Sequence, residues 1–359
     1  MQLNLSAPIC SSGYGLVSSE ILQALQKERV DVALFIIGPM ECQEGFQQAV
    51  SMAERKSSFW SRHAPSLRIY HQFSLAQHVG KGAHLGFPIF ELDTFTPQEV
   101  HHLRSQDLIL VATDWARGVL ERNQIGVPVE VVPFGVNQQI FHERALPAGS
   151  TTTFLHCGKL EYRKGAYDVL DAFGRAFGAK DDVRLVLHVH NPFMRQDVYG
   201  KLMREYEGLI LRHPLADKIQ VTTGRLESQY EVAALMERAD CGLFPSRAEG
   251  WNLELSEMLS MGRHCIATNY SGHTQFVHGH YCRLIEVDQT ESAFDGVYFH
   301  GQGRWAKLGA PQVEQFVEHL RAVHQQKQDG TLCVNQLGAS CMRELTWGKT
   351  ARKIKEILQ

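Results

Sequence analysis

The chain has 359 residues, of which 44% are hydrophobic and 21% are charged, and its formal net charge at pH 7 is −3. These values favour a globular protein of two domains and argue against a protein whose main task is to coat nucleic acid. No run of 18 apolar residues and no secretory signal at Met1 is evident, so we expect a cytoplasmic protein.

Short apolar runs alternate with amphipathic segments along the whole chain, which is typical of βα units and parallel sheets. A first series predicts strands near residues 2–6, 32–37, 67–70, 83–89, 108–112 and 129–132, with helices near 16–26, 44–59, 97–105 and 114–123. A second series predicts strands near residues 153–157, 184–190, 219–222, 241–244, 264–267 and 282–285. The expected fold class is α/β, with two Rossmann-like, doubly wound parallel-sheet domains that face a cleft.

A segment with proline and glycine, residues 144–150, separates the two series and is typical of a linker. We predict an N-terminal acceptor domain over residues 1–147 and a donor domain over residues 148–341. A C-terminal helix within residues 342–359 is expected to pack back on the first domain. Since ligands bind beyond the carboxyl ends of parallel strands, the site is expected in the cleft between the domains.

The most informative stretch starts at Glu249, because Glu257 follows eight positions later across a strand-to-helix junction. An apolar helical pattern begins at about Asn252. The backbone N–H groups of residues 250–253 would lie at the helix start, where they and the helix dipole attract phosphate oxygens. This arrangement suits a sugar nucleotide, with Glu249 beside the sugar and Glu257 accepting hydrogen bonds from ribose hydroxyls. Taken singly, either glutamate is also compatible with a surface position on an amphipathic helix.

Two lysines, Lys159 and Lys164, follow the predicted strand that ends at Gly158. Their ammonium groups could neutralise a diphosphate and the charge that develops on it as a leaving group. A solvated loop is the alternative for this pair alone. Two further segments, residues 132–141 and 267–272, also follow predicted strands and carry no distinctive chemistry by themselves.

Other motifs lead to no site. His278, His280 and Cys282 resemble part of a metal-ligand cluster, but no fourth ligand is evident nearby, so no metal site is predicted. Residues 348–350 lack the earlier glycine of a phosphate loop, and residues 13–15 lack the third glycine of a dinucleotide fingerprint. The eight cysteines include no Cys-x-x-Cys pair and are expected to be reduced.

In their order and spacing, these segments resemble the retaining glycosyltransferases of family 4, also described as glycosyl transferases group 1, which have the two-domain GT-B architecture. The resemblance rests on Gly158–Gly165, Pro133–Asn137 and the Glu-x7-Glu pattern of Glu249–Glu257. It covers most of residues 130–275 and is looser before residue 110. It implies a hexosyl- or pentosyltransferase of EC class 2.4 that needs no metal or other cofactor. A UDP- or GDP-linked sugar would be its co-substrate.

The resemblance also implies roles for individual residues. Many family members have a histidine after the fourth strand of the first domain, whereas this chain has Glu91 and Asp93 there, which become the candidates for its role near the anomeric carbon. The implied catalytic residues are Glu249, Lys164, Lys159, Glu91 and Asp93. The implied donor-binding residues are Gly13, Tyr14, Gly15, Lys159, Lys164, Arg225, Leu226, Glu249, Gly250, Trp251, Asn252, Leu253 and Glu257.

The acceptor is expected at a patch of basic and aromatic residues, which we call the basic-aromatic patch. Such a patch could hold a lipid headgroup at a membrane surface, a glycan or nucleic acid, and a solvated helix end is the alternative. The Gly-Tyr-Gly of residues 13–15 is similar to small phage-encoded members, some of which glycosylate hydroxymethylated cytosine in DNA. DNA in a host cytoplasm therefore stays open as a substrate. A non-catalytic nucleotide-sugar-binding protein and a GT-B epimerase stay open as other functions. The patch consists of Arg55, Lys56, Phe59, Trp60 and Arg62.

Overall fold

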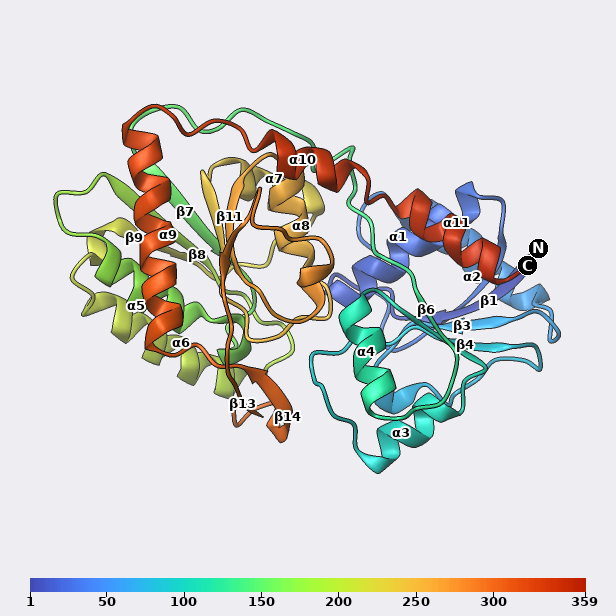
Figure 1. Ribbon diagram of the computed structural model, residues 1–359. Helices are drawn as coiled ribbons and strands as arrows, with labels where there is room; N and C mark the ends of the chain where they lie inside the picture. Colours follow the sequence, from blue (N-terminus) through green and yellow to red (C-terminus); the bar gives the residue numbers. More distant parts are fainter.

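The computed structural model describes residues 1–359 and contains two six-stranded parallel sheets, each covered by helices on both faces (Figure 1). We call each sheet with its helices a domain. The first sheet has the strand order β2-β1-β3-β4-β5-β6. Its strands are β1 (Gln2–Ala7), β2 (Asp31–Ile36), β3 (Ser66–Arg68), β4 (His84–Gly86), β5 (Leu108–Val111) and β6 (Val129–Val131).

Four helices of the first domain connect these strands, and two of them, the third and the fourth, begin at capping residues. Thr96 and Glu99 form a capping box with Pro97 at the first helical position of α3. The Thr113 side chain accepts a hydrogen bond from the Ala116 N–H at the start of α4. The helices are α1 (Gly13–Lys27), α2 (Gln47–Lys56), α3 (Pro97–Arg104) and α4 (Asp114–Arg122).

The second sheet has the strand order β12-β11-β10-β7-β8-β9. Its strands are β7 (Thr152–Cys157), β8 (Val183–His188), β9 (Ile219–Thr222), β10 (Cys241–Phe244), β11 (His264–Thr268) and β12 (Arg283–Ile285). Its helices are α5 (Ala166–Ala176), α6 (Gln196–Leu211), α7 (Gln229–Glu237), α8 (Leu253–Ser260) and α9 (Ala310–Gln328). The predicted α/β fold class, with two Rossmann-like parallel-sheet domains, is confirmed.

The predicted strand near residues 83–89 is shorter than expected. Only His84–Gly86 pair in the sheet as β4, and Pro88 lies in the loop that follows. Proline has no N–H to donate to a strand ladder, which explains why the chain leaves the sheet here. This loop carries Glu91 toward the second domain.

An antiparallel hairpin that the sequence did not predict extends from the second domain. It consists of β13 (Thr290–Phe294) and β14 (His300–Ala306). Asp295 Oδ1 closes its turn by accepting the N–H groups of Val297, Tyr298 and Phe299 at 2.8, 2.8 and 2.9 Å. In Figure 1 the hairpin projects from the lower edge of the second domain.

The chain crosses between the two domains twice. The first crossing follows β6, and the second leaves α10 (Gln336–Arg343) and ends in α11 (Trp347–Ile357), which packs on α1 (Figure 1). Arg352 pairs with Glu28 at 3.1 Å, and Lys355 donates to the Glu28 carbonyl at 2.8 Å. A Cβ atom at Gly135 would lie 2.1 Å from the backbone nitrogen of Trp347, so glycine is needed where the two crossings meet. None of the helices has the length and hydrophobicity to cross a bilayer.

Candidate active site

A pocket of about 200 Å³ lies between the domains, at the carboxyl ends of strands in both sheets. We call it the cleft pocket. The first domain contributes Ser11, Ser12 and Gly13, which follow β1. The second domain contributes Gly158 and Lys159 after β7, the segment after β8, and Glu254 and Glu257 on α8. Open parallel sheets bind ligands at this position.

Glu249 is buried, does not itself line the cleft pocket, and contacts two cations. Lys164 Nζ lies 2.8 Å from one carboxylate oxygen, and Arg163 Nη1 lies 3.0 Å from the other. Burial alone would raise the pKa of Glu249, but the Lys164 and Arg163 charges outweigh burial and hold this pKa well below its ordinary value. Glu249 is therefore a carboxylate with both oxygens oriented by the protein.

Arg163 is the centre of this cluster, and the sequence analysis missed it. Its buried guanidinium donates to the Ala248 carbonyl at 2.6 Å and to the carboxylates of Glu249 and Glu161 at 3.0 and 3.1 Å. Glu91, from the first domain, lies 3.6 Å from it. Burial would lower the pKa of Arg163, but the surrounding carboxylates raise it. The sequence did contain a signal for Arg163, because it directly precedes Lys164 in the same segment after β7.

Three predicted segments are brought together here by backbone contacts. Gly165 has φ +78°, and a Cβ atom there would lie 2.4 Å from the Pro245 carbonyl oxygen. The Arg247 N–H donates to the Arg163 carbonyl at 2.7 Å. The Glu249 N–H donates to Ser271 Oγ, and the Gly272 N–H donates to the Glu249 carbonyl, both at 2.8 Å. The loops after β7, β10 and β11 therefore form one unit around Glu249.

The start of α8 lies where the sequence predicted it, but the residues around this start contact different parts of the molecule. Asn252 has φ +81° and caps α8 by accepting the Leu255 N–H. Gly250 packs against Ile89 of the first domain, where a Cβ atom would lie 2.5 Å from the Ile89 side chain. Trp251 is buried among aromatic rings at the domain interface. Of the predicted residues of this stretch, Leu253 and Glu257 line the cleft pocket.

Glu257 faces the cleft pocket from α8 and lies near two other carboxylates. Burial raises its pKa well above the ordinary value, and Glu254 and Glu20 add to the shift. Glu20 belongs to α1 and accepts hydrogen bonds from Asn137 at 3.0 Å and from Gln229 at 3.4 Å. This end of the cleft pocket is therefore rich in acceptors for hydroxyl groups.

Lys159 and Arg225 lie at the edges of the cleft pocket. Lys159 Nζ lies 3.3 Å from Glu161 and 5.1 Å from the centroid of the Phe193 ring. Arg225 forms an ion pair with Glu41 of the first domain and donates to Ser11 Oγ at 2.9 Å. Its neighbour Leu226 also lines the pocket. The Arg225 ion pair links the two domains across the pocket.

The glycine-rich segment after β1 packs closely against the backbone of Cys10 and contacts the loop that carries Glu91. A Cβ atom at Gly15 would lie 2.1 Å from the Cys10 carbonyl oxygen, so only glycine fits there. Tyr14 donates its hydroxyl to the Ile89 carbonyl and accepts the Ile89 N–H at 3.1 Å. Burial, and secondarily Glu91, raises the pKa of Tyr14, which stays a neutral donor. Gly13 lines the cleft pocket.

The two predicted carboxylates after β4 lie in different surroundings. Glu91 lies at the Arg163 cluster, as described above. Asp93 Oδ1 instead accepts the Arg304 N–H at 2.8 Å, so this carboxylate binds the hairpin. A residue that the sequence analysis missed, His71, lies 4.5 Å from Tyr14 between ring centroids. Burial lowers its pKa, and Glu91 partly offsets this shift.

The basic-aromatic patch lies away from the cleft pocket. Lys56 pairs at 3.0 Å with Asp31, the first residue of β2, whereas the pocket lies at the carboxyl ends of the strands. Phe59 is 84% exposed, and Trp60 packs edge-on against Phe35. The helix α2, which ends with Arg55 and Lys56 of the patch, lies on the far side of the first domain from the second domain (Figure 1). None of the five predicted acceptor residues lines the pocket.

Comparison with known proteins adds a family to this geometry. Residues 151–298 match the family model described as "Glycosyl transferases group 1". The second domain is a glycosyl transferases group 1 domain. The sequence matches no curated protein.

Solved structures resemble this chain over its full length. Sucrose-phosphate synthase from Thermosynechococcus elongatus has a TM-score of 0.73 at 14% identity, covering 99% of this chain and 98% of that one. Anabaena Alr3699/HepE in complex with UDP and glucose has a TM-score of 0.68 at 14% identity, covering 100% and 99%. An α,α-trehalose-phosphate synthase from Burkholderia xenovorans, in complex with glucose-6-phosphate, has a TM-score of 0.69 at 14% identity, covering 100% of both chains. At these identities the likeness establishes the GT-B fold.

Proposed function

We propose that the protein is a retaining glycosyltransferase of family 4 that acts in the cytoplasm. It transfers a hexosyl or pentosyl group from a UDP- or GDP-linked sugar to an acceptor hydroxyl. The observation that carries the proposal is the buried Glu249 carboxylate held by Lys164 and Arg163 beside a pocket between two parallel sheets. Two solved relatives are described with UDP and glucose and with glucose-6-phosphate, which supports a nucleotide sugar as donor.

The positive groups suit a diphosphate leaving group. Lys159 lines the cleft pocket. Lys164 pairs with Glu249 behind the wall of the pocket, and a Cβ atom at Gly158, which lines the pocket, would lie 3.6 Å from Lys164 Cδ. In the reaction, the bond between the anomeric carbon and the diphosphate oxygen breaks as the acceptor oxygen bonds to the carbon, and the acceptor proton passes to the diphosphate. Positive charge fixed around the departing oxygens lowers the barrier to this step. We propose that these residues serve this role without a metal ion.

Arg163 allows Lys164 to serve the donor. A lysine that turned from Glu249 to a phosphate would leave a buried carboxylate without a partner, which costs several kcal/mol in general. Here Arg163 stays bonded to the second oxygen of Glu249. Glu249 therefore keeps its charge and its orientation toward the sugar, while Lys164 is free to bind phosphate.

Glu257 is the proposed partner of the ribose. It faces the cleft pocket from α8, on the side where Glu254 also lines the wall. Its carboxyl oxygens can accept hydrogen bonds from ribose hydroxyls. Arg225 and Leu226 border the same pocket and are the proposed neighbours of the base.

A panel of UDP- and GDP-sugars, screened by thermal shift and then by product analysis, tests the proposal. A bound donor raises the melting temperature by mass action. Lys164→Ala should lower turnover at least 100-fold, since such fixed charges contribute about 3 kcal/mol to a transition state. Lys201→Ala, an exposed lysine on α6, is the matched control. Wild-type rates in Lys164→Ala or Glu249→Ala would refute the assignment.

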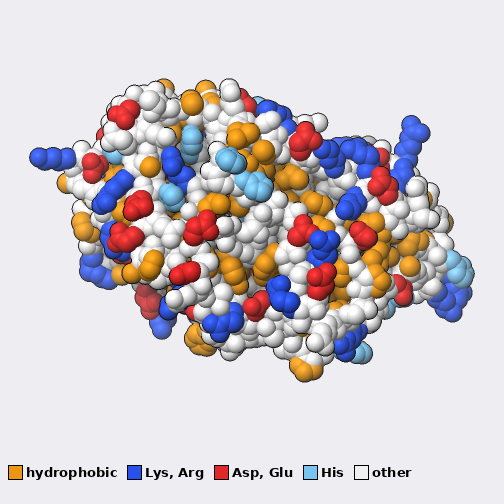
Figure 2. Space-filling view, in the orientation of Figure 1, with side chains coloured by type: hydrophobic (Ala, Val, Ile, Leu, Met, Phe, Trp, Pro, Cys, Tyr) orange, Lys and Arg blue, Asp and Glu red, His pale blue; other side chains and the backbone are white.

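Product analysis separates the remaining alternatives. An α-linked product from an α-linked donor shows retention, an isomerised sugar nucleotide formed without acceptor shows an epimerase, and donor binding without turnover shows a binding protein. For hydroxymethylated DNA, a gel shift that weakens steeply with salt is the test. On the face in Figure 2, cationic and anionic side chains are interspersed, and they form no continuous basic band for a DNA backbone.

A further inference from the structure

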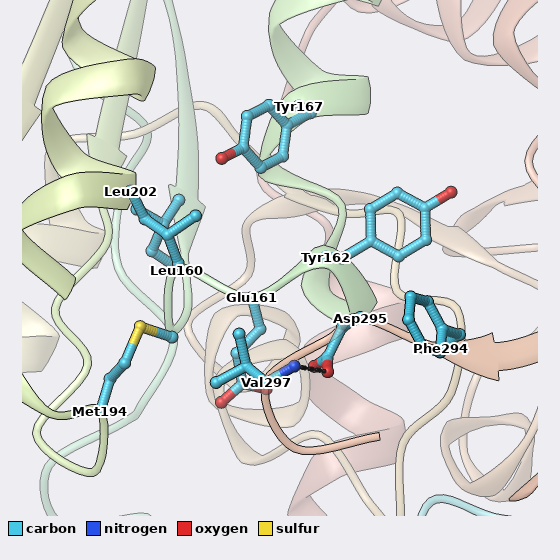
Figure 3. Close-up of a pocket in the computed structure, with 9 residues that line it drawn as sticks. All are labelled: Leu160, Glu161, Tyr162, Tyr167, Met194, Leu202, Phe294, Asp295 and Val297. Carbon is cyan, nitrogen blue, oxygen red and sulfur yellow. Dashed lines mark hydrogen bonds between the residues drawn. The ribbon is translucent and has the colours of Figure 1, made fainter. Parts of the chain in front are cut away.

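A second pocket, of about 290 Å³, lies where the hairpin covers the second domain (Figure 3). We call it the hairpin pocket. Its walls come from the segment after β7, from α5, from the segment between β8 and α6, from α6 itself, and from the hairpin. Seven of its nine lining residues are hydrophobic, and nothing in the proposed reaction uses them.

The two carboxylates of the hairpin pocket already have partners. Asp295 accepts three backbone N–H groups of its own turn, one of which is drawn in Figure 3. Glu161 is bonded by Arg163 at 3.1 Å and by Asn191 at 3.4 Å. The pocket therefore presents no unpaired carboxylate, and an occupant would meet mainly apolar side chains.

Aromatic rings that are exposed to solvent surround the hairpin pocket. Phe294 is 57% exposed and Tyr162 is 39% exposed, and both line it. The segment after β7 and the hairpin thus each place a partly exposed ring in the lining, and exposed apolar groups gathered in this way mark binding surfaces.

The hairpin pocket shares a wall with the cleft pocket. Lys159 and Phe193 line the cleft pocket, and the next residues along the chain, Leu160 and Met194, line the hairpin pocket. Glu161, at the shared wall, is separated from Glu249 only by the guanidinium of Arg163. A molecule in the hairpin pocket would therefore lie beside the centre at which the sugar is proposed to react.

We propose that the hairpin pocket binds the apolar part of the acceptor, so that the acceptor is an alcohol or phenol carrying an aromatic ring system or a short alkyl chain. An apolar cavity of about 150 Å³ holds one benzene ring, so twice that volume fits a bicyclic ring or a chain of about eight carbons. The inference rests on the proposed function, because it names the acceptor class for that reaction. The chemistry of this wall disfavours a bare sugar, whose hydroxyls would find few partners.

2-Naphthol is a suitable probe, because its fluorescence reports binding and its hydroxyl reports transfer. Wild-type protein should bind it and, with the donor found by thermal shift, should form naphthyl glycoside. Val297→Trp fills the pocket from the hairpin turn, and Phe294→Ala removes part of its wall. Each should weaken naphthol binding at least tenfold. Leu337→Ala, which removes an exposed apolar side chain on α10, should leave naphthol binding unchanged.

The outcomes separate this inference from the proposed function. Naphthol binding that both hairpin variants leave unchanged, or no naphthol binding at all, overturns the inference. Naphthol that binds and changes donor hydrolysis without being glycosylated also overturns it, because the pocket would then serve an effector. If no nucleoside diphosphate binds, the proposed function fails. Naphthol binding lost in Val297→Trp would in that case still support the pocket as an apolar site.

Discussion

Removal of the Arg163 side chain tests the charge cluster most directly. Arg163→Ala deletes the donor that holds the carboxylates of Glu161 and Glu249 and the Ala248 carbonyl. Breaking one partner out of a buried ion-pair network typically costs about 3–5 kcal/mol, which lowers the equilibrium constant for folding roughly 150- to 4000-fold. Lys164 still pairs with Glu249, so the loss should lie nearer the lower figure.

The assay for Arg163→Ala combines urea unfolding with amide hydrogen exchange. Exchange should accelerate in the loops at residues 158–165 and 245–249, because Arg163 links them. Arg163→Lys should recover only part of the loss, since an ammonium group lacks the planar fork that reaches three acceptors at once. Arg195→Ala, whose ion pair with Asp197 is exposed, should unfold as the wild type does.

An Arg163→Ala protein with wild-type stability and wild-type exchange in both loops would refute the reasoning. It would mean that the two carboxylates are solvated or protonated, and that the guanidinium does not organise them. Donor binding in Arg163→Lys gives a second readout. A raised KM with unchanged kcat would place the effect on donor affinity alone and would contradict the role proposed for Arg163 in holding Glu249 toward the reacting sugar.

Three further predictions concern protonation and domain closure. Burial lowers the pKa of His156 to about 4, so this side chain stays neutral in the folded protein, whereas it binds a proton near pH 6.5 in the unfolded chain. The free energy of unfolding should therefore fall by about 3 kcal/mol between pH 6.5 and pH 4. His156→Gln should remove this part of the pH dependence in urea titrations. Burial raises the pKa of Glu257, so this residue destabilises the folded protein increasingly as the pH rises above about 4.3. Glu257→Gln should therefore have a higher melting temperature than the wild type at pH 7, yet bind the donor more weakly in calorimetry. An unchanged donor affinity would argue against the ribose role. Arg225→Ala removes the ion pair with Glu41, and small-angle scattering should show a larger radius of gyration for the unliganded variant than for the wild type. High salt should produce the same expansion in the wild type. Identical scattering curves for the variant and the wild type would show that this ion pair does not hold the cleft closed.

Much of the fold could be predicted from local pattern, because buried parallel strands produce short apolar runs at regular spacing. The Glu249 loop and the Lys164 loop could also be recognised, since each follows a strand end. Their convergence follows from the topology, because β7 and β10 are neighbours in the sheet.

Long-range pairings could not be predicted in the same way. Arg163 meets Glu249 at a separation of 86 positions, and only packing decides which cation reaches that carboxylate. The hairpin was missed because residues 290–306 are mixed in polarity and include three glycines, so no clear alternation marks two strands. Asp93 resembled Glu91 in sequence, but the hairpin that binds Asp93 was not foreseen.

The double crossing of the chain also constrains how the two domains move. With one flexible link, the domains could rotate and translate freely relative to each other. Two links that run side by side near Gly135 and Trp347 restrict this motion to rotation about a hinge axis. Rotation about the line through them stays easy, while translation along the cleft would stretch one link. Deleting the last eleven residues would remove most of α11, which anchors the second link to the first domain. We expect the truncated chain to lose the defined hinge axis that guides how donor and acceptor approach each other.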